Sequence, residues 1–334
     1  MAFVDIATPL VQAEDNNGDF SVINFELGWA SDLVFFKRRN TESNTIEIHE
    51  LSARTLYQGF GLHTATALSQ QEDQNGDFYL GIFNDNAYRP DLFFIKRRNT
   101  DSNTIEVHVL SGNSGYQDFL LHTPTPLSQN EDQNGDFAIA DFNGDGTRDL
   151  VFIKRRNTDS GTIELHVLSA KSGYQEFTLH ADTALAQSED QNGDFSFVFL
   201  DALAFIKRRN TDSNMVELHV LSPQSGYKEF WVHTATCFPQ SEDANGDFQI
   251  GMLGFGAAGF FFVKRRNTES DQIEVHVCEL PQLSALDADG SQPSPQPPEG
   301  FGNPPNYGPG LPQKQFGRRF EPQKRFARRF EKQR

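Results

Sequence analysis

One short stretch near the middle of the chain places oxygen-bearing side chains at alternate positions. Asp141, Asn143, Asp145, Thr147 and Asp149 are each separated by one residue, and glycine occupies two of the intervening positions. Loops that surround Ca²⁺ use carboxylate, amide and carbonyl oxygens in this alternation, with a glycine where the chain turns sharply. The stretch therefore predicts one Ca²⁺ site with these five residues as ligands. The alternative is a turn of the same composition that holds no ion.

The nine histidines of the chain stand at two repeated positions. Five follow a glutamate in the pattern Glu-x-His, namely His49, His108, His166, His219 and His276, and four precede Thr or Ala in a later segment, namely His63, His122, His180 and His233. Side chains two apart on a strand share a face, so a Glu-x-His pair suits Zn²⁺ binding or proton transfer. A catalytic site is normally a single asymmetric group of residues, whereas these groups are near-identical copies. We therefore predict no catalytic residues and no enzymatic activity.

A repeated tyrosine offers an aromatic surface beside hydrogen-bonding groups, which is what a sugar-binding site requires. It stands just before the last strand of four repeats, and a tryptophan follows it in one of them. The predicted ligand-binding residues are Tyr57, Tyr116, Tyr174, Tyr227 and Trp231, together with His63, His122, His180 and His233. A tyrosine at such a turn also serves as a lid over the core, and this alternative stays open.

Two charged motifs recur five times each, Lys-Arg-Arg-Asn and Asp-x-Asn-Gly-Asp-Phe. Arginine suits phosphate, but strand alternation places Lys154 and Arg156 on one face with Glu164 and His166 of the next strand. We predict cross-strand Lys–Glu pairs there, with a polar ligand site on that face as the alternative. The second motif predicts a turn into the first strand of each repeat, in which Asn-Gly supplies a positive φ. Its alternative is a polar pocket repeated five times.

These motifs belong to five repeats, whose Lys-Arg-Arg-Asn strings follow one another at intervals of 53 to 59 residues. The apolar segments are short, rich in β-branched and aromatic residues, and bounded by Gly, Asn, Asp and Ser, which indicates strands. The third repeat predicts four strands, at Phe137–Asp141, Leu150–Arg156, Thr162–Ser169 and Gln175–His180. Four-stranded units repeated radially form a propeller. The sequence therefore predicts an all-β fold, a five-bladed β-propeller of four-stranded antiparallel blades.

The two ends of the repeat region distinguish a closed ring from an open solenoid. Residues 3–10 resemble the last strand of a repeat, as in residues 120–127, whereas the fifth repeat stops after its third strand at Ile273–Val277. If the N-terminal strand completes the last blade, every blade has four strands and no long sheet edge stays unpaired. We therefore expect the ring to close through the N-terminal strand.

The third repeat resembles the FG-GAP/VCBS repeats of integrin-like propellers. The likeness rests on residues 141–154, followed by residues 162–169 and by Gly173-Tyr174-Gln175, and it extends over residues 1–280. It is similar in particular to the versions found beside bacterial glycoside-active domains and in propeller lectins. The resemblance implies a propeller, Ca²⁺ in intact loops, and a role in adhesion or sugar binding. In the other four repeats the calcium loop departs from the family pattern.

The net charge of −17 combines an acidic repeat region with a basic C-terminal end. An acidic surface repels nucleic-acid phosphates, so we exclude nucleic acid as a partner of the propeller. Cys237 and Cys278 lie in different repeats without the spacing of a metal site, and we exclude a disulfide framework. The N-terminus lacks the basic and apolar regions of a signal peptide, which predicts a cytoplasmic protein or export by a non-classical route.

Three regions and one function follow from these patterns. Residues 1–280 are the propeller, residues 281–311 a Pro/Gly-rich linker, and residues 312–334 a basic Phe/Arg tail. We expect the tail to be disordered or to form a short helix that contacts anionic surfaces. We predict a non-enzymatic, lectin-like propeller that binds glycans or glycoproteins at sites repeated in each blade. The alternative is a scaffold for protein interaction or adhesion, with a calcium-stabilised propeller.

Overall fold

The computed structural model describes residues 3–25, 30–83, 89–198, 201–253, 257–280 and Leu283. The chain divides into two units, residues 1–290 and residues 291–334, and every described residue belongs to the first unit. The predicted tail and, apart from Leu283, the predicted linker therefore lie outside the described residues. No helix among the described residues is long and apolar enough to cross a membrane.

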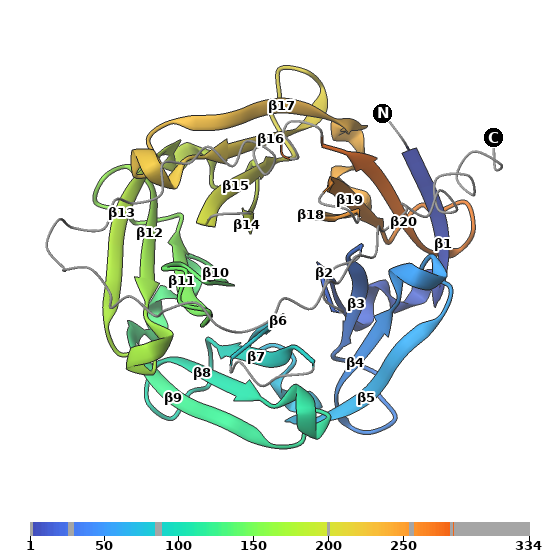
Figure 1. The fold of residues 1–334 in the computed structure, drawn as a ribbon, viewed down its shortest axis with the longest axis horizontal. Helices are drawn as coiled ribbons and strands as arrows, with labels where there is room; N and C mark the ends of the chain where they lie inside the picture. The colour runs from blue at the N-terminus through green and yellow to red at the C-terminus, as the bar shows by residue number, and fades with distance from the viewer. Residues whose placement is uncertain are drawn as a thin grey trace, which may run out of the picture. The chain divides into compact units, whose positions relative to one another are not determined.

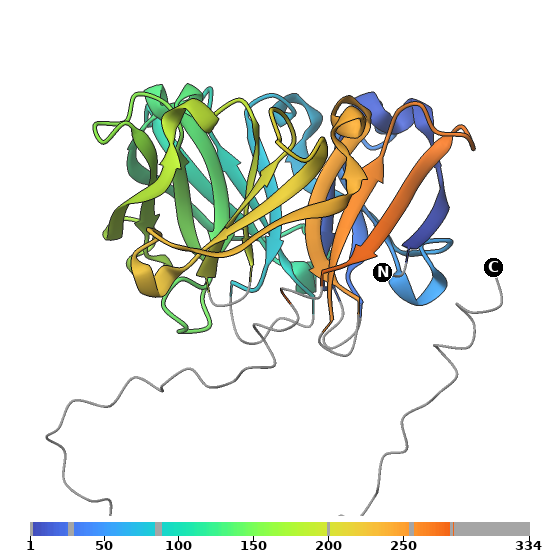
Figure 2. The same ribbon diagram turned by 90° about the horizontal axis from the view of Figure 1, so that it is seen from above.

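The described strands form five antiparallel sheets of four strands, arranged as blades around a common axis (Figure 1). This confirms the predicted five-bladed β-propeller, and Figure 2 shows the strands running obliquely between its two rims. From the axis outward, the strands are β2 (Gly18–Ile23), β3 (Asp32–Lys37), β4 (Thr45–Leu51) and β5 (Phe60–Ser69) in blade 1; β6 (Gly76–Gly81), β7 (Asp91–Lys96), β8 (Thr104–Leu110) and β9 (Phe119–Ser128) in blade 2; β10 (Gly135–Ala140), β11 (Asp149–Lys154), β12 (Thr162–Leu168) and β13 (Phe177–Ala186) in blade 3; β14 (Gly193–Val198), β15 (Ala202–Lys207), β16 (Met215–Leu221) and β17 (Phe230–Pro239) in blade 4; and β18 (Gly246–Met252), β19 (Ala258–Lys264), β20 (Gln272–Glu279) and β1 (Phe3–Val11) in blade 5.

The N-terminal strand completes the last blade, as predicted. β1 pairs antiparallel with β20, and Asp5 stands opposite His276 in their register. The Thr8 hydroxyl also donates to the Ile273 carbonyl at 2.9 Å. Because the two strands are the first and last of the propeller, this pairing closes the ring and leaves blade 5 with the same four strands as the other blades.

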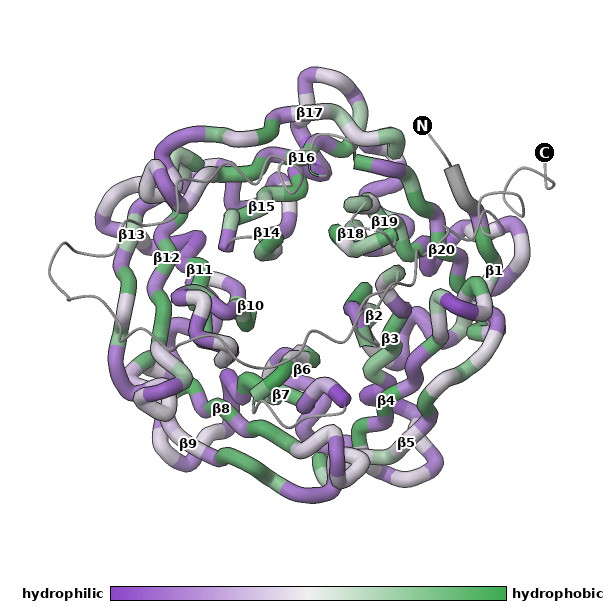
Figure 3. Tube along the Cα trace, in the orientation of Figure 1, coloured by the Kyte–Doolittle hydropathy of each residue, from purple (hydrophilic) through white to green (hydrophobic). Residues whose placement is uncertain are grey.

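The hydrophobic core consists of five clusters, each between two neighbouring blades. Strand β11 contributes to two of them, with Leu150 and Phe152 packed toward blade 2 and Val151 and Ile153 toward blade 4. All four side chains are at most 1% exposed, and burying each one contributes about 1.5–3 kcal/mol. A strand buried on both faces explains its unbroken apolar sequence. Figure 3 shows that hydrophobic segments recur in every blade.

Each Asp-x-Asn-Gly-Asp-Phe motif forms a 3₁₀ turn that leads into an innermost strand, as η5 (Gln129–Gln133) leads into β10. The predicted positive φ at its glycine was wrong, since Gly18 has a φ of 172°, which is extended backbone. A Cβ on Gly18 would lie 1.9 Å from a carbonyl oxygen of the adjacent strand, and one on Gly135 would lie 2.0 Å away. Glycine is therefore required for close approach. The positive φ occurs instead at the asparagine of Lys-Arg-Arg-Asn, as at Asn157.

Cys237 on β17 and Cys278 on β20 form a disulfide between blades 4 and 5. The sequence analysis excluded a disulfide framework and did not foresee this single bond. The two cysteines are 41 positions apart in different repeats, but neighbouring blades bring their Cα atoms to 6.5 Å, a separation that a disulfide spans. The bond ties the blade that holds the N-terminal strand to the preceding blade, which reinforces the ring beside its closure.

Candidate functional site

Each innermost strand begins with Gly-Asp-Phe, which places one aspartate at the same position of every blade. These residues are Asp19, Asp77, Asp136, Asp194 and Asp247, and we call them the aspartate ring. Their side chains are 30 to 51% exposed, on the strands nearest the axis. Sequence reasoning treated these aspartates as part of a turn, although their recurrence at the start of all five strands was a visible signal. They present five carboxylates to solvent from a rigid core.

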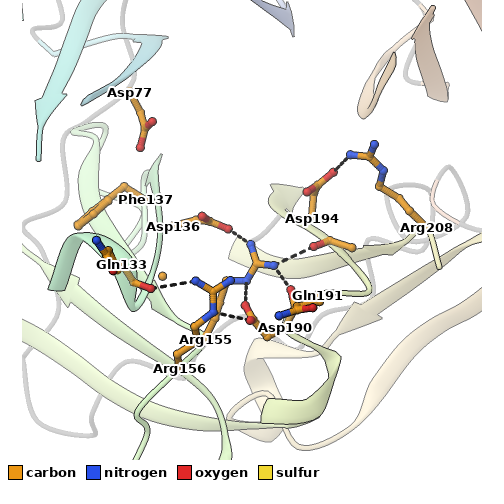
Figure 4. Close-up of polar contacts among 12 residues, drawn as sticks. Asp77, Gln133, Asp136, Phe137, Arg155, Arg156, Asp190, Gln191, Asp194 and Arg208 are labelled. Atoms are coloured by element: carbon orange, nitrogen blue, oxygen red, sulfur yellow. Dashed lines mark hydrogen bonds and ion pairs between the residues drawn. The ribbon is translucent and has the colours of Figure 1, made fainter. Parts of the chain in front are cut away.

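An arginine pair from each Lys-Arg-Arg-Asn string connects the aspartate ring to the next blade (Figure 4). Arg155 donates to Asp136 of its own blade, and its Nε lies 2.8 Å from Asp190 Oδ1 of blade 4. Arg156 contacts the other oxygen of that carboxylate, with its Nε 2.5 Å from Asp190 Oδ2. The Arg155 guanidinium also lies over the Phe195 ring, 5.2 Å from its centroid. One aspartate of blade 4 therefore holds both arginines of blade 3.

The same arrangement recurs in all five blades and closes on itself. The first arginine of each pair bridges two aspartates: Arg38 joins Asp19 and Asp73, Arg97 joins Asp77 and Asp132, Arg208 joins Asp194 and Asp243, and Arg265 joins Asp247 and Asp15. These first arginines, with Arg155, are only 12 to 16% exposed. Removing one partner of a buried ion pair leaves an uncompensated charge, so the network couples each blade to its neighbours.

The lysine of each string has a different partner from the one we predicted. Lys154 stands opposite Glu164 in the register of β11 and β12, but its ammonium lies 3.6 Å from Glu131 in η5. The Ser160 hydroxyl already donates to Glu164 Oε1 at 2.7 Å. The predicted cross-strand Lys–Glu pair was therefore wrong, because each glutamate has a nearer donor and the long lysine reaches past the end of its strand.

Hollows lie between consecutive arginine pairs. One of about 330 Å³ is lined by Arg97, Arg98, Asp132, Gln133, Gly135, Asp136, Arg155 and Arg156. Hollows of about 230 and 260 Å³ repeat this lining at the following and the preceding blade. Each is lined by four arginines and two aspartates, so positive groups outnumber negative ones. The polar pocket that was the alternative for the Asp-x-Asn-Gly-Asp-Phe motif therefore exists beside the aspartate ring.

The members of the aspartate ring differ in their electrostatics. Although the Asp77 side chain is 33% exposed, the protein crowded around its carboxyl group displaces water and raises its pKa, and the charges of Asp136 and Asp19 raise the pKa further. Arg97 opposes this effect without reversing it. Burial also raises the pKa of Asp247, and Asp19 again contributes to the increase. A carboxyl group with a raised pKa keeps its proton closer to neutral pH, so Asp77 and Asp247 are the members best suited to donate one.

The tyrosines predicted to bind a ligand lie in the core. Tyr57, Tyr116, Tyr174 and Tyr227 are at most 6% exposed. The Tyr174 hydroxyl donates to the Arg148 carbonyl at 2.9 Å, which satisfies its polar end inside the protein. Buried tyrosines cannot form a surface for a sugar, so their predicted role in ligand binding was wrong. Their burial agrees with the alternative, in which each tyrosine is a lid over the core. Trp231 is half-buried against the cluster between blades 4 and 5.

The histidines predicted to bind a ligand are exposed on the outermost strands. These are His63, His122, His180 and His233. Each stands opposite the histidine of a Glu-x-His pair, as His63 stands opposite His49. Burial lowers the pKa of His49, which favours its neutral imidazole. These groups lie on the outer half of each blade, apart from the aspartate ring, and their binding of a ligand stays a prediction.

The loop predicted to bind Ca²⁺ connects β10 and β11. Asp141 Oδ1 accepts from the Asp145 backbone at 2.9 Å, and Asn143 Oδ1 accepts from the same N–H at 3.0 Å. The Thr147 hydroxyl donates to Asp145 Oδ1, and Lys171 Nζ lies 3.0 Å from Asp145 Oδ2. Four of the five predicted ligands thus gather around one turn. The fifth, Asp149, is fully buried, and its Oδ1 accepts from the Ala170 backbone at 2.8 Å.

The charges of this loop also act on a carboxylate of blade 4, Asp201, which sequence reasoning missed. Burial raises the pKa of Asp201 to about 6, and the charges of Asp141 and Asp149 contribute to the increase. The fourth repeat is shortened at this point, so its sequence offered no loop pattern to suggest this electrostatic interaction. Crowded carboxylates of this kind form the oxygen-rich surroundings that Ca²⁺ prefers.

No family model and no curated protein matches this sequence. Similar solved structures include an engineered GH43 glycoside hydrolase that displays endo-xylanase and exo-arabinofuranosidase activity, with 10% identity over 83% of this chain and 52% of that chain, at a TM-score of 0.47. An exo-β-1,3-galactanase from Phanerochaete chrysosporium has 9% identity over 83% and 64% of the two chains, at 0.45. An endo-arabinase from Bacteroides thetaiotaomicron has 12% identity over 82% and 97%, at 0.47. The chain spans about half the length of the first of these structures.

These neighbours contradict the predicted non-enzymatic, lectin-like module, because they are described as a glycoside hydrolase, a galactanase and an arabinase. The prediction assumed that near-identical repeats cannot form an asymmetric site. Near-identical repeats can nevertheless differ in electrostatics, since the pKa is raised at Asp77 and Asp247 by different sets of neighbours. At identities of 9 to 12%, the likeness concerns the fold and assigns no role to any residue.

Proposed function

We propose that the propeller is a glycan-acting enzyme, a glycoside hydrolase whose proton donor and base belong to the aspartate ring. The observation that carries the proposal is the ring of carboxylates on the innermost strands, in which Asp77 and Asp247 have a raised pKa under the influence of Asp19. The three residues stand on the innermost strands of blades 2, 5 and 1, which pack against one another through two core clusters. Glycoside hydrolysis needs one carboxylic acid that protonates the leaving oxygen and a second carboxylate that activates water or attacks the sugar.

The geometry supports a division of roles within this group. Arg97 Nη1 donates to Asp77 Oδ2 at 2.6 Å, which orients the carboxyl group and leaves its other oxygen for a leaving group. Asp19 is 51% exposed and is held by Arg38 Nη1 at 2.9 Å, so a water molecule or a sugar carbon can approach it. Asp77 is therefore the proposed acid and Asp19 the proposed base or nucleophile. Asp247, on the blade at the other side of Asp19, is the equivalent acid.

The hollows beside the aspartate ring support a carbohydrate substrate. Their volumes, about 230 to 330 Å³, are near the lower end of the range for small-molecule sites. Guanidinium, carboxylate and amide groups supply the donors and acceptors that sugar hydroxyls require. Four arginines against two aspartates also favour a sugar that carries a carboxylate, since guanidinium groups bind carboxylates in pairs of hydrogen bonds. Uronic-acid-containing glycans are therefore included in the proposed substrate class.

The test is the release of reducing ends from neutral and uronic-acid-containing polysaccharides by the full-length protein. Asp77→Asn combined with Asp247→Asn should lower kcat/KM by about 100-fold or more, because it removes both proposed acids and general acid catalysis contributes that much. Asp101→Asn, in an exposed turn between β7 and β8, is the matched control and should leave the rate unchanged. Melting temperatures separate loss of chemistry from loss of folding. A folded protein that releases no reducing ends, or full activity in Asp77→Asn, Asp247→Asn and Asp19→Asn, would contradict the proposal.

We also propose that residues 141–149 bind Ca²⁺, as the resemblance to FG-GAP/VCBS repeats implies. The proposal is supported by the turn that gathers Asp141, Asn143 and Asp145. Ca²⁺ would neutralise these carboxylates and hold the loop in one conformation. Saturating Ca²⁺ should raise the melting temperature by a few degrees, since ligand at 100 times its Kd stabilises by about 2.7 kcal/mol. Asp145→Ala should abolish the difference in melting temperature between Ca²⁺ and EDTA. If the melting temperature of the unaltered protein is the same in Ca²⁺ and in EDTA, the site is contradicted.

A further inference from the structure

Blades 1, 2 and 4 each carry a group of two histidines and one glutamate on their outer strands. The groups are Glu47, His49 and His63; Glu106, His108 and His122; and Glu217, His219 and His233. In each group, one nitrogen from each imidazole and one carboxylate oxygen lie within 4.8 Å of one another. We call them the Glu-His-His clusters. Blade 3 has the same three residue types, with His166 Nδ1 turned toward His180 Nδ1 at 2.7 Å.

The strand pairing within one blade assembles each cluster. Glu47 and His49 are two residues apart on β4 and share a face, and His63 stands directly opposite His49 on β5. His49 Nε2 lies 3.1 Å and His63 Nε2 4.0 Å from Glu47 Oε2. A metal with bonds of about 2.0–2.2 Å holds tetrahedral ligand atoms about 3.4 Å apart, so small side-chain rotations would bring the three atoms onto one ion.

A hydrogen bond from serine orients the glutamate of each cluster. Ser43 Oγ donates to Glu47 Oε1 at 2.7 Å, which leaves Oε2 directed at the two imidazoles. Ser102 holds Glu106 at the same distance. Glu47 is only 9% exposed, whereas His63 is 62% exposed. Each cluster therefore has a fixed, buried ligand and an open side, and outer-shell hydrogen bonds of this kind pre-orient metal ligands.

A Glu–His hydrogen bond accounts for only two of the three residues. It does not explain the exposed histidine, whose ring centroid lies 4.0 Å from that of His49 in blade 1. The corresponding separations are 3.9 Å in blade 2 and 4.2 Å in blade 4. Since an exposed imidazole is free to turn into solvent, its recurrence beside the other two donors favours a ligand common to all three.

We propose that the Glu-His-His clusters bind divalent first-row transition metal ions, with Zn²⁺ as the ion that the donors suit best. Two imidazole nitrogens and one carboxylate oxygen are the three protein ligands of an open Zn²⁺ site, whereas Ca²⁺ and Mg²⁺ prefer oxygen alone. The fourth position faces solvent beside an exposed phenylalanine, such as Phe60, whose ring centroid lies 6.1 Å from that of His49. The clusters are independent of the aspartate ring and of the hydrolase proposal.

Blade 5 provides a control within the same chain. Asp5 on β1 stands where the other blades have the exposed histidine, and it contacts His276 Nδ1. Glu274 occupies the glutamate position, with its Oε2 3.1 Å from His276 Nε2. This blade therefore offers one imidazole and two carboxylates, a donor set with lower affinity for Zn²⁺. Asp5→His would give it the composition of the other blades.

The experiment is calorimetric titration of the metal-free, full-length protein with Zn²⁺ in the presence of excess Ca²⁺. We expect three to four equivalents, and Co²⁺ in place of Zn²⁺ should give the intense visible absorption of tetrahedral coordination. The combined variant His63→Ala, His122→Ala, His180→Ala and His233→Ala should bind less than one equivalent, and Asp5→His should bind one more than the unaltered protein. The four histidines are exposed, so the melting temperature of the combined variant should stay close to the original.

A second measurement separates a metal site from chance binding to surface histidines. Ser43→Ala, Ser102→Ala and Ser213→Ala together should weaken Zn²⁺ binding about 10-fold or more, because they remove the hydrogen bonds that orient the glutamates. Less than one equivalent of Zn²⁺ in the unaltered protein would overturn the proposal. So would a stoichiometry that the fourfold histidine variant does not change, or an affinity indifferent to the serines.

Discussion

The aspartate ring and the Glu-His-His clusters both recur around the propeller, yet they are assembled in different ways. Arg155 joins Asp136 of its own blade to Asp190 of the next, so the inner network exists only where blades meet. Glu47 and His63, in contrast, come from one hairpin of a single blade. The inner side chains therefore hold the ring together in addition to any chemistry. The outer ones depend only on their own strands, which leaves them freer to bind a ligand.

The largest effect should follow removal of a shared aspartate from the inner network. Asp190→Ala leaves the buried Arg155 and the neighbouring Arg156 without their common partner, and we expect the free energy of unfolding to fall by about 3–5 kcal/mol. Urea denaturation measures the change. Asp182→Ala, which removes an exposed pair with Lys228, is the control and should cost about 0–1 kcal/mol. Equal costs would show that the inner network contributes no more than a surface pair.

A smaller effect is expected from the covalent link between blades 4 and 5. Replacing Cys237 and Cys278 together by Ala should lower stability by about 2–4 kcal/mol, because the unfolded chain gains the freedom of the loop that the disulfide closes. The melting temperature with and without reductant measures the same quantity in the unaltered protein. If reductant has no effect, contacts between blades stabilise the closed ring without help from the disulfide.

The smallest expected effect is a loss of stability at acidic pH, caused by the histidines of the outer strands. Burial lowers the pKa of His49, His108, His166 and His219 in the folded protein. The folded state thus binds fewer protons than the unfolded state, and stability should decrease as the pH falls below about 6.5. Asp201, with its pKa raised to about 6, acts in the opposite direction, and so do Asp77, Asp149 and Asp247, whose pKa is also raised. We expect a net fall of a few degrees in melting temperature between about pH 7.5 and pH 5.5.

A single substitution checks the source of this pH dependence. His108→Gln removes one of the four imidazoles whose pKa is lowered and should reduce the loss on acidification by about a quarter. Asp201→Asn should make the loss larger, since it removes the group that gains a proton on folding. A melting temperature that rises on acidification would show that carboxylates, rather than the outer histidines, dominate in this range.

Much of the fold could be predicted because its signals are local. The apolar run of β11 and the turn residues around it recur with each repeat, and Phe3–Val11 carries the pattern of a last strand. The candidate sites were predicted less well. Tyr116 has the composition of a sugar platform, but its burial depends on the neighbouring blade. The aspartates of Gly-Asp-Phe were assigned to a turn because one repeat does not show that five of them surround an axis.

The amino-acid sequence alone determined the number of blades, the order of their strands and the strand that closes the ring. These features follow from residue alternation within each strand and from the recurrence of one pattern five times along the chain. Only the tertiary structure decided that Arg156 pairs with Asp190, 34 positions away, and that Cys237 meets Cys278. Such contacts depend on how two finished blades pack and where long side chains end, and no period along the chain specifies either.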